Sequence, residues 1–259
     1  MPEYCKVERD GRVLNVTIDR PKLMNSLHPP ANQELEEVFD AFVADDDLWV
    51  AILTGAGDRA FSAGNDLKYT AAHAGKLGVQ NRYGFAGLTD RYDCWKPVIA
   101  AVNGVAMGGG FEIALACDLI IASERAIFAL PEPRVGLAAL AGGLHRLPRQ
   151  IGLKQAMGMV LTGRRVSAEE GQALGFVNEV VAHEELMGAA RGWADQIIEC
   201  APISVRASKQ AIHQGLDQAS LESASHAAYE QVKVLMQSED FIEGPRAFSE
   251  KRDPVWKGR

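Results

Sequence analysis

One stretch in the middle of the chain limits the possible folds more than any other part. An apolar run at residues 98–102 is broken by Asn103-Gly104, three glycines follow at 108–110, a helical pattern covers 109–116, and a second apolar run lies at 119–122. A strand, a loop, a helix and a second strand joined by short connections form a βαβ crossover. The crossover predicts an α/β fold in which helices cover a parallel sheet.

The segments before the crossover fit the same fold class. Asp10-Gly11 is a turn signal ahead of an alternating apolar run at 13–19, which predicts a hairpin. Apolar side chains recur at helical spacing over 35–43, in a helix expected to begin near Pro29. The run at 49–54 is apolar without alternation, so we expect a strand buried on both faces.

The second half of the chain is predicted to be mostly helical. The expected elements are helices at 153–161, 167–175, 202–214 and 221–236, and a strand at 176–181. The helix at 167 opens with the capping-box sequence Ser167-Ala-Glu-Glu170. Because the sequence has no repeat and no long linker, the C-terminal helices either belong to the same unit or extend onto a neighbouring subunit.

Composition and charge exclude several classes of function. The 259 residues are 47% hydrophobic, which is enough for a large core, and the net charge of -7 leaves no broad basic face for nucleic acid. The N-terminus has no apolar signal core, and no stretch reaches membrane-spanning length without charge. The four cysteines form no C-x-x-C pair, which is typical of reduced thiols. We therefore expect a cytoplasmic protein with no nucleic-acid or membrane partner.

Two glutamates lie in contexts that hold a carboxyl group stiffly. Glu112 follows three glycines and Phe111, and Glu132 stands between Pro131 and Pro133. Pro133 disfavours a helical conformation at the preceding residue, so Glu132 is expected to be extended. Two rigid carboxyls are what acid–base chemistry at one carbon centre needs. The alternatives are that Glu112 serves only the helix dipole and that Glu132 lies in a surface turn.

Two glycine loops can offer backbone N–H donors. A helix that starts at the three glycines leaves the N–H of Gly109 unpaired at the positive end of the helix dipole, where it can bind a negative oxygen. The loop at 60–68 can supply a second free N–H near Asn65. The alternatives are a tight turn at the glycines that serves packing alone and an ordinary turn at 60–68.

The second loop region also contains partial matches to two other motifs, and both are disfavoured. Gly55-Ala-Gly57-Asp-Arg-Ala60 has the shape of a dinucleotide-binding fingerprint, but no helical pattern opens after it and position 80 is glutamine instead of an acid. Ser62 nearly fits a hydrolase nucleophile elbow, with His145 or His183 as its base, but the first glycine of that motif is missing. The six histidines include no H-x-x-x-H or H-E-x-x-H pair, so no metal site is expected.

Four phrases in this order resemble the crotonase superfamily, the enoyl-CoA hydratase/isomerase family. They are Ala60-Phe-Ser-Ala-Gly-Asn-Asp-Leu-Lys68, Lys96-Pro-Val-Ile-Ala-Ala-Val-Asn-Gly104, Gly108-Gly-Gly-Phe-Glu112 and Leu130-Pro-Glu132. The resemblance runs from about Val7 to Lys257, and the segments at 84–89 and 238–259 are similar to the carnitinyl-CoA dehydratase branch. It implies a crotonase-like spiral of ββα units at 1–200, which holds the acyl-CoA site, and a C-terminal helical region at 201–259 used in trimerisation.

The resemblance also implies a role for each motif residue. The backbone N–H groups of Asn65 and Gly109 would form an oxyanion hole for the thioester oxygen of an acyl-CoA, Glu112 would activate water at Cβ, and Glu132 would exchange the proton at Cα. The other residues implied to contact CoA or the acyl group are Ala63, Asp66, Leu67, Lys68, Leu140, Phe248 and Lys251. Phe248 and Lys251 match positions that often reach CoA from the next subunit of a trimer or of a dimer of trimers. The region at 82–85 is expected to wall the acyl pocket.

The implied function is an acyl-CoA hydro-lyase that reversibly hydrates a 2-enoyl-CoA to a 3-hydroxyacyl-CoA, with carnitinyl-CoA-like substrates included and no cofactor besides the coenzyme A of the substrate. Both acids are present, whereas relatives that only shift a double bond typically need just the one that matches Glu132. One departure is Leu140, which stands where many hydratases have glycine beside the catalytic water, and its bulk puts efficient crotonyl-CoA hydration in question. The alternatives are an isomerase or thioester hydrolase on the same fold and a non-catalytic acyl-CoA-binding protein.

Overall fold

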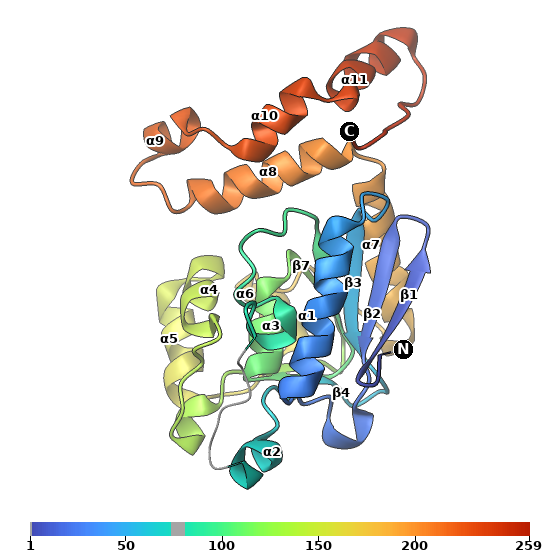
Figure 1. Cartoon of the computed structure of the whole chain (residues 1–259). Coiled ribbons are helices and arrows are strands. Elements are labelled where there is room, and N and C mark those ends of the chain that lie inside the picture. The colour runs from blue at the N-terminus through green and yellow to red at the C-terminus, as the bar shows by residue number, and fades with distance from the viewer. Residues whose placement is uncertain (1, 74–80) are drawn as a thin grey trace.

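The computed structural model describes residues 2–73 and 81–259, in which two β-sheets are flanked by helices (Figure 1). The larger sheet has the strand order β1-β2-β3-β5-β7-β10 and the smaller sheet the order β4-β6-β8-β9. The strands of the larger sheet are β1 (Cys5–Asp10), β2 (Val13–Ile18), β3 (Val50–Gly55), β5 (Val98–Val102), β7 (Leu119–Ser123) and β10 (Glu179–Val181). Those of the smaller sheet are β4 (Ala60–Ser62), β6 (Val105–Met107), β8 (Ile127–Ala129) and β9 (Val166–Ser167). All pairings are parallel except β1 with β2 and β8 with β9.

The chain winds through both sheets in a spiral. It passes from β3 to β4, from β5 to β6 and from β7 to β8, so each turn places one strand in each sheet before a helical segment follows. The predicted α/β fold and the ββα spiral are thereby confirmed. The pattern at 98–122 was predicted as strand, loop, helix and strand, but β6 lies inside that loop. Its three residues are too few to produce a periodic signal.

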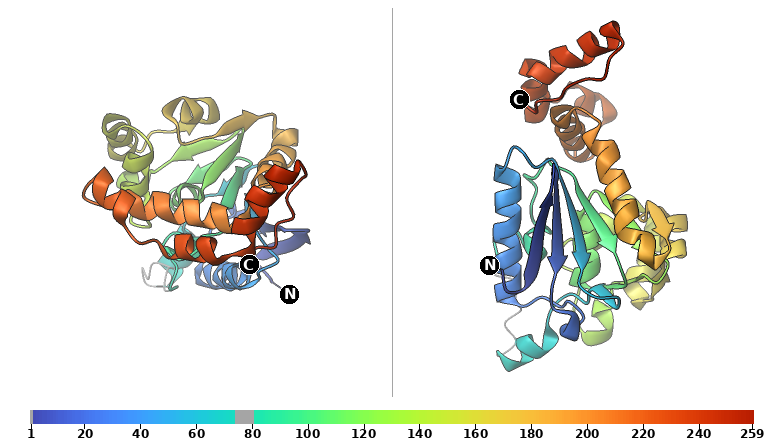
Figure 2. Two further views of the ribbon diagram at one scale, coloured as in Figure 1. Left: turned by 90° about the horizontal axis from the view of Figure 1, so that it is seen from above. Right: turned by 90° about the vertical axis from the view of Figure 1, so that its right-hand side faces the viewer.

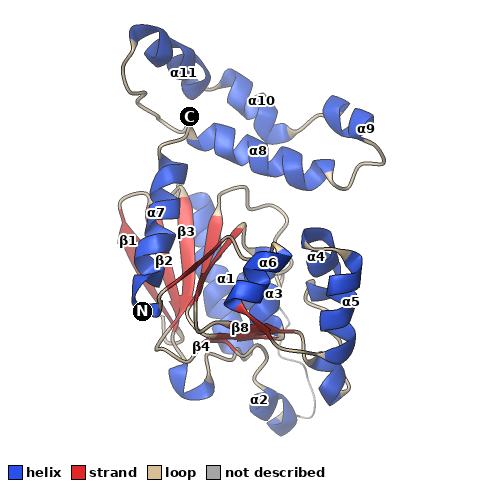
Figure 3. Ribbon diagram, turned by 180° about the vertical axis from the view of Figure 1, so that it is seen from behind, coloured by secondary structure: helices blue, strands red, loops and turns tan. Residues whose placement is uncertain are grey.

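Helices cover both faces of the larger sheet. The helices up to residue 198 are α1 (Pro29–Ala44), α2 (Leu67–Ala72), α3 (Gly109–Ala116), α4 (Gly143–Gln150), α5 (Leu153–Thr162), α6 (Ala168–Leu174) and α7 (Leu186–Ile198). α1 lies on one face of this sheet and α7 on the other, as the right-hand view of Figure 2 shows, and Figure 3 shows α7 from behind. Within residues 2–73 and 81–259, none of the helices combines the length and the apolar character that crossing a membrane requires.

β3 explains why a central strand here is apolar without alternation. Ala51 and Leu53 face the main core, whereas Val50 and Ile52 pack in a second cluster with α7 residues such as Ala190. Both faces of the strand are therefore covered, as expected for a parallel sheet between helices. The predicted strands at 49–54, 98–102 and 119–122 are confirmed within one residue at each end.

Several predicted boundaries in the second half are wrong. The strand predicted at 176–181 is shorter in the structure, where β10 contains only residues 179–181. The helix α4 was not predicted as a separate element. The Ser167 hydroxyl accepts from the N–H of Glu170 (3.2 Å), but the carboxylate of Glu170 pairs with Arg164 (2.7 Å) and does not close the predicted capping box. The ion pair with Arg164 therefore takes the Glu170 side chain away from the helix cap that the local sequence predicted for it.

The C-terminal segment contains α8 (Pro202–Gly215), α9 (Leu221–His226), α10 (Glu230–Gln237) and α11 (Glu239–Glu250). The single helix predicted at 221–236 is divided, because Ala227 and Tyr229 are extended and the Tyr229 hydroxyl donates to the carbonyl oxygen of Ala224 (2.7 Å). α10 instead packs on α8, where Gln210 accepts from the N–H of Gln231 (2.6 Å). These helices stand off one end of the sheets (Figures 1 and 2). The boundary at 200 stays a prediction.

Candidate active site

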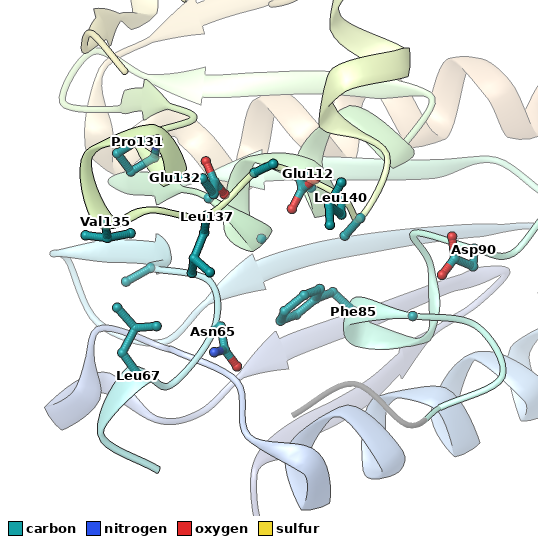
Figure 4. Close-up of a pocket in the computed structure, with 16 residues that line it drawn as sticks. Asn65, Leu67, Phe85, Asp90, Glu112, Pro131, Glu132, Val135, Leu137 and Leu140 are labelled. Atoms are coloured by element: carbon teal, nitrogen blue, oxygen red, sulfur yellow. The ribbon is translucent and has the colours of Figure 1, made fainter. Parts of the chain in front are cut away.

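A cavity of about 360 Å³ opens between the loops that follow β4, β6 and β8 (Figure 4). The predicted site residues that line it are Ala63, Asn65, Leu67, Gly109, Glu112, Glu132 and Leu140. These residues come from three different turns of the spiral, so the fold gathers motifs that are up to 77 positions apart in the chain, from Ala63 to Leu140.

The loop after β4 packs directly on the first turn of α3. Gly64 has a φ of +81°, and a Cβ atom there would lie 2.7 Å from the amide nitrogen of Gly109. A Cβ atom on Gly110 would overlap the carbonyl oxygen of Ser62. Only glycine allows this approach of one backbone to another. The contact brings Asn65 and Gly109 to the same cavity.

The backbone geometry leaves the N–H groups of both residues available. Leu27 pairs with Asn65 in an isolated parallel bridge in which Leu27 donates to Gly64 (2.7 Å) and accepts from Asp66 (2.9 Å). In such a bridge the bonds go to the two flanking residues, so the N–H of Asn65 points away from Leu27. Gly109 begins α3, where N–H groups have no acceptor within the helix. Within the described part of the chain neither N–H has an acceptor, so both can bind one oxygen of a ligand.

Glu112 is buried one helical turn after Gly109, with 3% of its surface exposed. The N–H of Gly143 donates to its Oε1 (2.9 Å) and holds the carboxyl in place. Burial, together with the negative charge of Glu132, raises the pKa of Glu112 to about 7, against the hydrogen bond from Gly143, which lowers it. Near neutral pH this carboxyl therefore exists in both protonation states.

Glu132 begins a short 3-10 helix, η3 (Glu132–Val135). The prediction of an extended conformation is wrong, because hydrogen bonds from Arg134 to Pro131 and from Leu137 to Glu132 close the turn on itself. The Oε2 atom is buried and has no partner among the described residues, and burial raises the pKa of this carboxyl. The Oε1 atom lies over Gly108, where a Cβ atom would come within 2.8 Å of it. Glu112 and Glu132 lie beside each other on one wall in Figure 4, across from Asn65.

Four other predicted contact residues do not line the cavity. Asp66 is buried and caps α2 by accepting from the N–H of Tyr69 (3.1 Å). Its carboxylate also pairs with Arg20 (3.1 Å). Lys68 is exposed on α2. Phe248 is 88% exposed on α11, and Lys251 caps the end of that helix. One copy of the chain does not bring Phe248 and Lys251 to the site, so their contact with CoA from a neighbouring subunit stays a prediction.

Part of the cavity wall was missed from sequence. Gly84 and Phe85 line it, within the region expected to wall the acyl pocket, but Asp90, Val135 and Leu137 were not identified. The glycines at 84 and 87, both with positive φ, are the only local signal of the compact turn that presents Asp90.

The hydrolase alternative built on Ser62 is excluded by burial. Ser62 has no exposed surface, its hydroxyl donates to the carbonyl oxygen of Asn25 (2.8 Å), and it accepts from the N–H of Gly64 (3.1 Å). β3 and β4 are joined by a short turn with no helix between them, so the dinucleotide fingerprint also lacks its structural context.

Comparison with known proteins identifies the family of this chain. The family model described as enoyl-CoA hydratase/isomerase matches residues 8–259. The carnitinyl-CoA dehydratase of Salmonella agona is 44% identical over 263 residues, with both chains covered completely. The crystal structure of an enoyl-CoA hydratase from Mycobacterium tuberculosis H37Rv superposes with a TM-score of 0.90 at 39% identity and 99% coverage of both chains. That of a Bacillus anthracis enoyl-CoA hydratase gives 0.90 at 36% identity, with 99% of this chain and 100% of that chain covered. The chain belongs to the enoyl-CoA hydratase/isomerase family.

Proposed function

We propose that this protein is an acyl-CoA hydro-lyase that interconverts 3-hydroxyacyl-CoA and 2-enoyl-CoA with Glu112 and Glu132. The observation that carries the proposal is the convergence of the buried Glu112, the half-buried Glu132 and two unpaired backbone N–H groups on one cavity. Relatives named carnitinyl-CoA dehydratase and enoyl-CoA hydratase support the same reaction class.

In the direction of water loss, the carboxylate of Glu132 takes the proton from Cα. The electron pair moves into the thioester carbonyl, and the N–H groups of Asn65 and Gly109 stabilise the enolate oxygen. The enolate then expels the hydroxyl group at Cβ, and the protonated carboxyl of Glu112 gives it a proton, so water leaves. Hydration is the same sequence in reverse: Glu112 takes a proton from the attacking water, and Glu132 returns a proton to Cα.

The protonation states of the pair fit these steps. The reaction needs one protonated and one ionised carboxyl, and the two groups titrate as a coupled pair. Burial and the charge of Glu132 raise the pKa of Glu112 to about 7, so Glu112 is the group that retains a proton near neutral pH. Glu132 is left ionised, as a base at Cα must be.

The rate is expected to depend on pH through this pair. As the pH rises through the pKa of Glu112, about 7, the pair loses its one proton and both carboxyls ionise. We expect kcat/KM to fall about tenfold per pH unit well above that value, in either reaction direction, because both directions use the singly protonated pair. Initial rates from pH 5 to pH 9 check this, and a rate that stays constant from pH 7 to pH 9 would contradict it.

A single-turnover assay tests the proposed reaction. Crotonyl-CoA and 4-(trimethylammonio)but-2-enoyl-CoA are incubated with excess protein, and the products are separated by mass and retention time. A 3-hydroxyacyl-CoA product supports the proposal, whereas a shifted double bond identifies an isomerase and free coenzyme A identifies a thioester hydrolase. Leu140 lines the cavity, so the relative rates of the two substrates also test whether its bulk disfavours crotonyl-CoA.

The remaining features of the proposal concern cofactor, assembly and compartment. The carboxyls and N–H groups supply proton transfer and charge stabilisation, so the reaction needs no cofactor beyond the coenzyme A of the substrate.

We also propose a trimer or a dimer of trimers built through the C-terminal helices, where large apolar side chains are exposed: Ile212, Leu216, Leu221, Met236, Phe241, Ile242 and Phe248. Light scattering would give the mass of the assembly. All four cysteines are free thiols, which supports a location in the cytoplasm.

A further inference from the structure

The charged side chains that line the cavity are all acidic. They are Asp90, Glu112 and Glu132, and within the described part of the chain no lysine, arginine or histidine joins them. Glu112 and Glu132 are used by the proposed reaction. Asp90 has no part in it.

Asp90 presents an exposed carboxylate from a fixed backbone position. Its N–H donates to the carbonyl oxygen of Tyr83 (3.0 Å), and its Oδ2 lies over Gly84, where a Cβ atom would come within 2.7 Å. Two basic residues lie nearby: Arg91 pairs with Asp40 (2.7 Å), and Arg146 donates through Nη2 to the carbonyl oxygen of Thr89 (2.8 Å), while its buried Nη1 has no partner among the described residues. Across residues 2–73 and 81–259, Asp90 forms no ion pair.

The order of the carboxyls along the cavity gives the direction of the acyl chain. In Figure 4, Glu132, Glu112 and Asp90 follow one another from left to right, and Leu67 and Val135 lie at the left end. If Cα lies at Glu132 and Cβ at Glu112, the next atoms of the acyl chain continue towards Asp90. A substituent on Cγ therefore points towards Asp90 (Figure 4).

We propose that Asp90 determines specificity by binding a quaternary ammonium group on Cγ of the acyl chain. The inference rests on the proposed function, because that function sets where Cα and Cβ lie. A quaternary ammonium ion is large and weakly hydrated, so it suits a site that combines one carboxylate with the ring of Phe85 and the side chain of Leu140. An acyl group with a terminal carboxylate is disfavoured here by repulsion from the carboxylates of Asp90 and Glu132.

Two substrates of the same shape and different charge test the proposal. One is 4-(trimethylammonio)but-2-enoyl-CoA, and the other is 5,5-dimethylhex-2-enoyl-CoA, in which carbon replaces the charged nitrogen. The measured quantity is the ratio of kcat/KM for the charged substrate to kcat/KM for the neutral one. Wild-type protein is expected to prefer the charged substrate, and Asp90→Asn is expected to lower the ratio about fivefold, the size of a partly solvated ion pair.

Two further variants serve as controls. Asp90→Glu keeps the charge and should retain most of the preference. Asp58→Asn removes one negative charge from an exposed turn outside the cavity and should leave the ratio unchanged. An Asp90→Asn ratio equal to that of the wild type, or a wild-type protein that does not distinguish the two substrates, would overturn the proposal.

A binding measurement separates this inference from the proposed function. Calorimetry compares the affinities for the saturated thioesters, 4-(trimethylammonio)butanoyl-CoA and 5,5-dimethylhexanoyl-CoA, in wild type and Asp90→Asn. If no enoyl-CoA is turned over but wild type binds the charged thioester more tightly and Asp90→Asn does not, the proposed reaction fails and charge recognition stands. Equal affinities for both thioesters in both proteins reject charge recognition even where hydration is observed.

Discussion

Glu132→Gln is expected to lower kcat for the hydration of an enoyl-CoA by a factor of about 10²–10⁴, the usual contribution of a positioned acid–base group. Glutamine has the same shape, but it can neither give a proton to Cα nor take one from it. Stopped-flow absorbance at the enoyl thioester band measures the loss. Glu124→Gln, which changes an exposed carboxyl outside the cavity, should keep wild-type activity.

The fold of the Glu132→Gln variant is expected to survive. Oε2 of Glu132 is buried without a partner and burial raises the pKa of the carboxyl, so a neutral side chain of equal size removes a cost of desolvation and leaves the packing intact. Thermal unfolding should therefore show a Tm at least equal to that of the wild type. A loss of activity smaller than about tenfold in a folded variant would reject the role assigned to Glu132.

Gly109→Pro is expected to lower kcat by about 10²–10³, as does the removal of one oxyanion-hole donor in other enzymes. Proline replaces the N–H of residue 109 by the ring Cδ atom, and its backbone angles are well tolerated at the first position of a helix. The matched control is Gly109→Ala, which adds a Cβ atom at the same place but retains the N–H.

The pair of variants separates the donor from the packing. A Cβ atom at 109 would lie 3.2 Å from the ring of Phe85, and this contact is common to both substitutions, whereas only proline also replaces the N–H by a ring carbon. The account requires Gly109→Ala to remain at least tenfold more active than Gly109→Pro. Equal losses in the two variants would mean that the backbone N–H is not used and that space beside Phe85 is what matters.

The fold class and the larger sheet could be predicted from the sequence because their signals are local. β3, β5 and β7 are apolar runs, and each is buried on both faces, by the main core on one side and by the cluster around α7 on the other. β6 and β8 have three residues each, which is too few for an alternation of apolar and polar side chains to be recognised in the sequence. Their existence followed from the family resemblance and not from the pattern of residues.

The candidate site also contains residues that local sequence signals indicated and residues that they did not. Glu112, Glu132 and Gly109 were singled out because three glycines before a helix indicate free backbone N–H groups and two prolines restrict the backbone, and the family resemblance implied that they share a site. Asp90 was missed because its importance depends on the turn at Gly84, which places a loop residue at the end of a cavity built from other turns of the spiral. The predicted extended conformation of Glu132 was wrong for a related reason. Hydrogen bonds within η3 outweigh the preference that Pro133 imposes on the residue before it.

The central claim is that two carboxyls face a thioester whose oxygen is held by two backbone N–H groups. A crystal structure of the Glu132→Gln variant with a bound 3-hydroxyacyl-CoA tests it most directly. The account predicts the thioester oxygen within about 2.7–3.1 Å of the amide nitrogens of both Asn65 and Gly109, the Cβ hydroxyl at Glu112 and Cα beside residue 132. A thioester oxygen that contacts neither amide, or a Cβ hydroxyl that points away from Glu112, would contradict it.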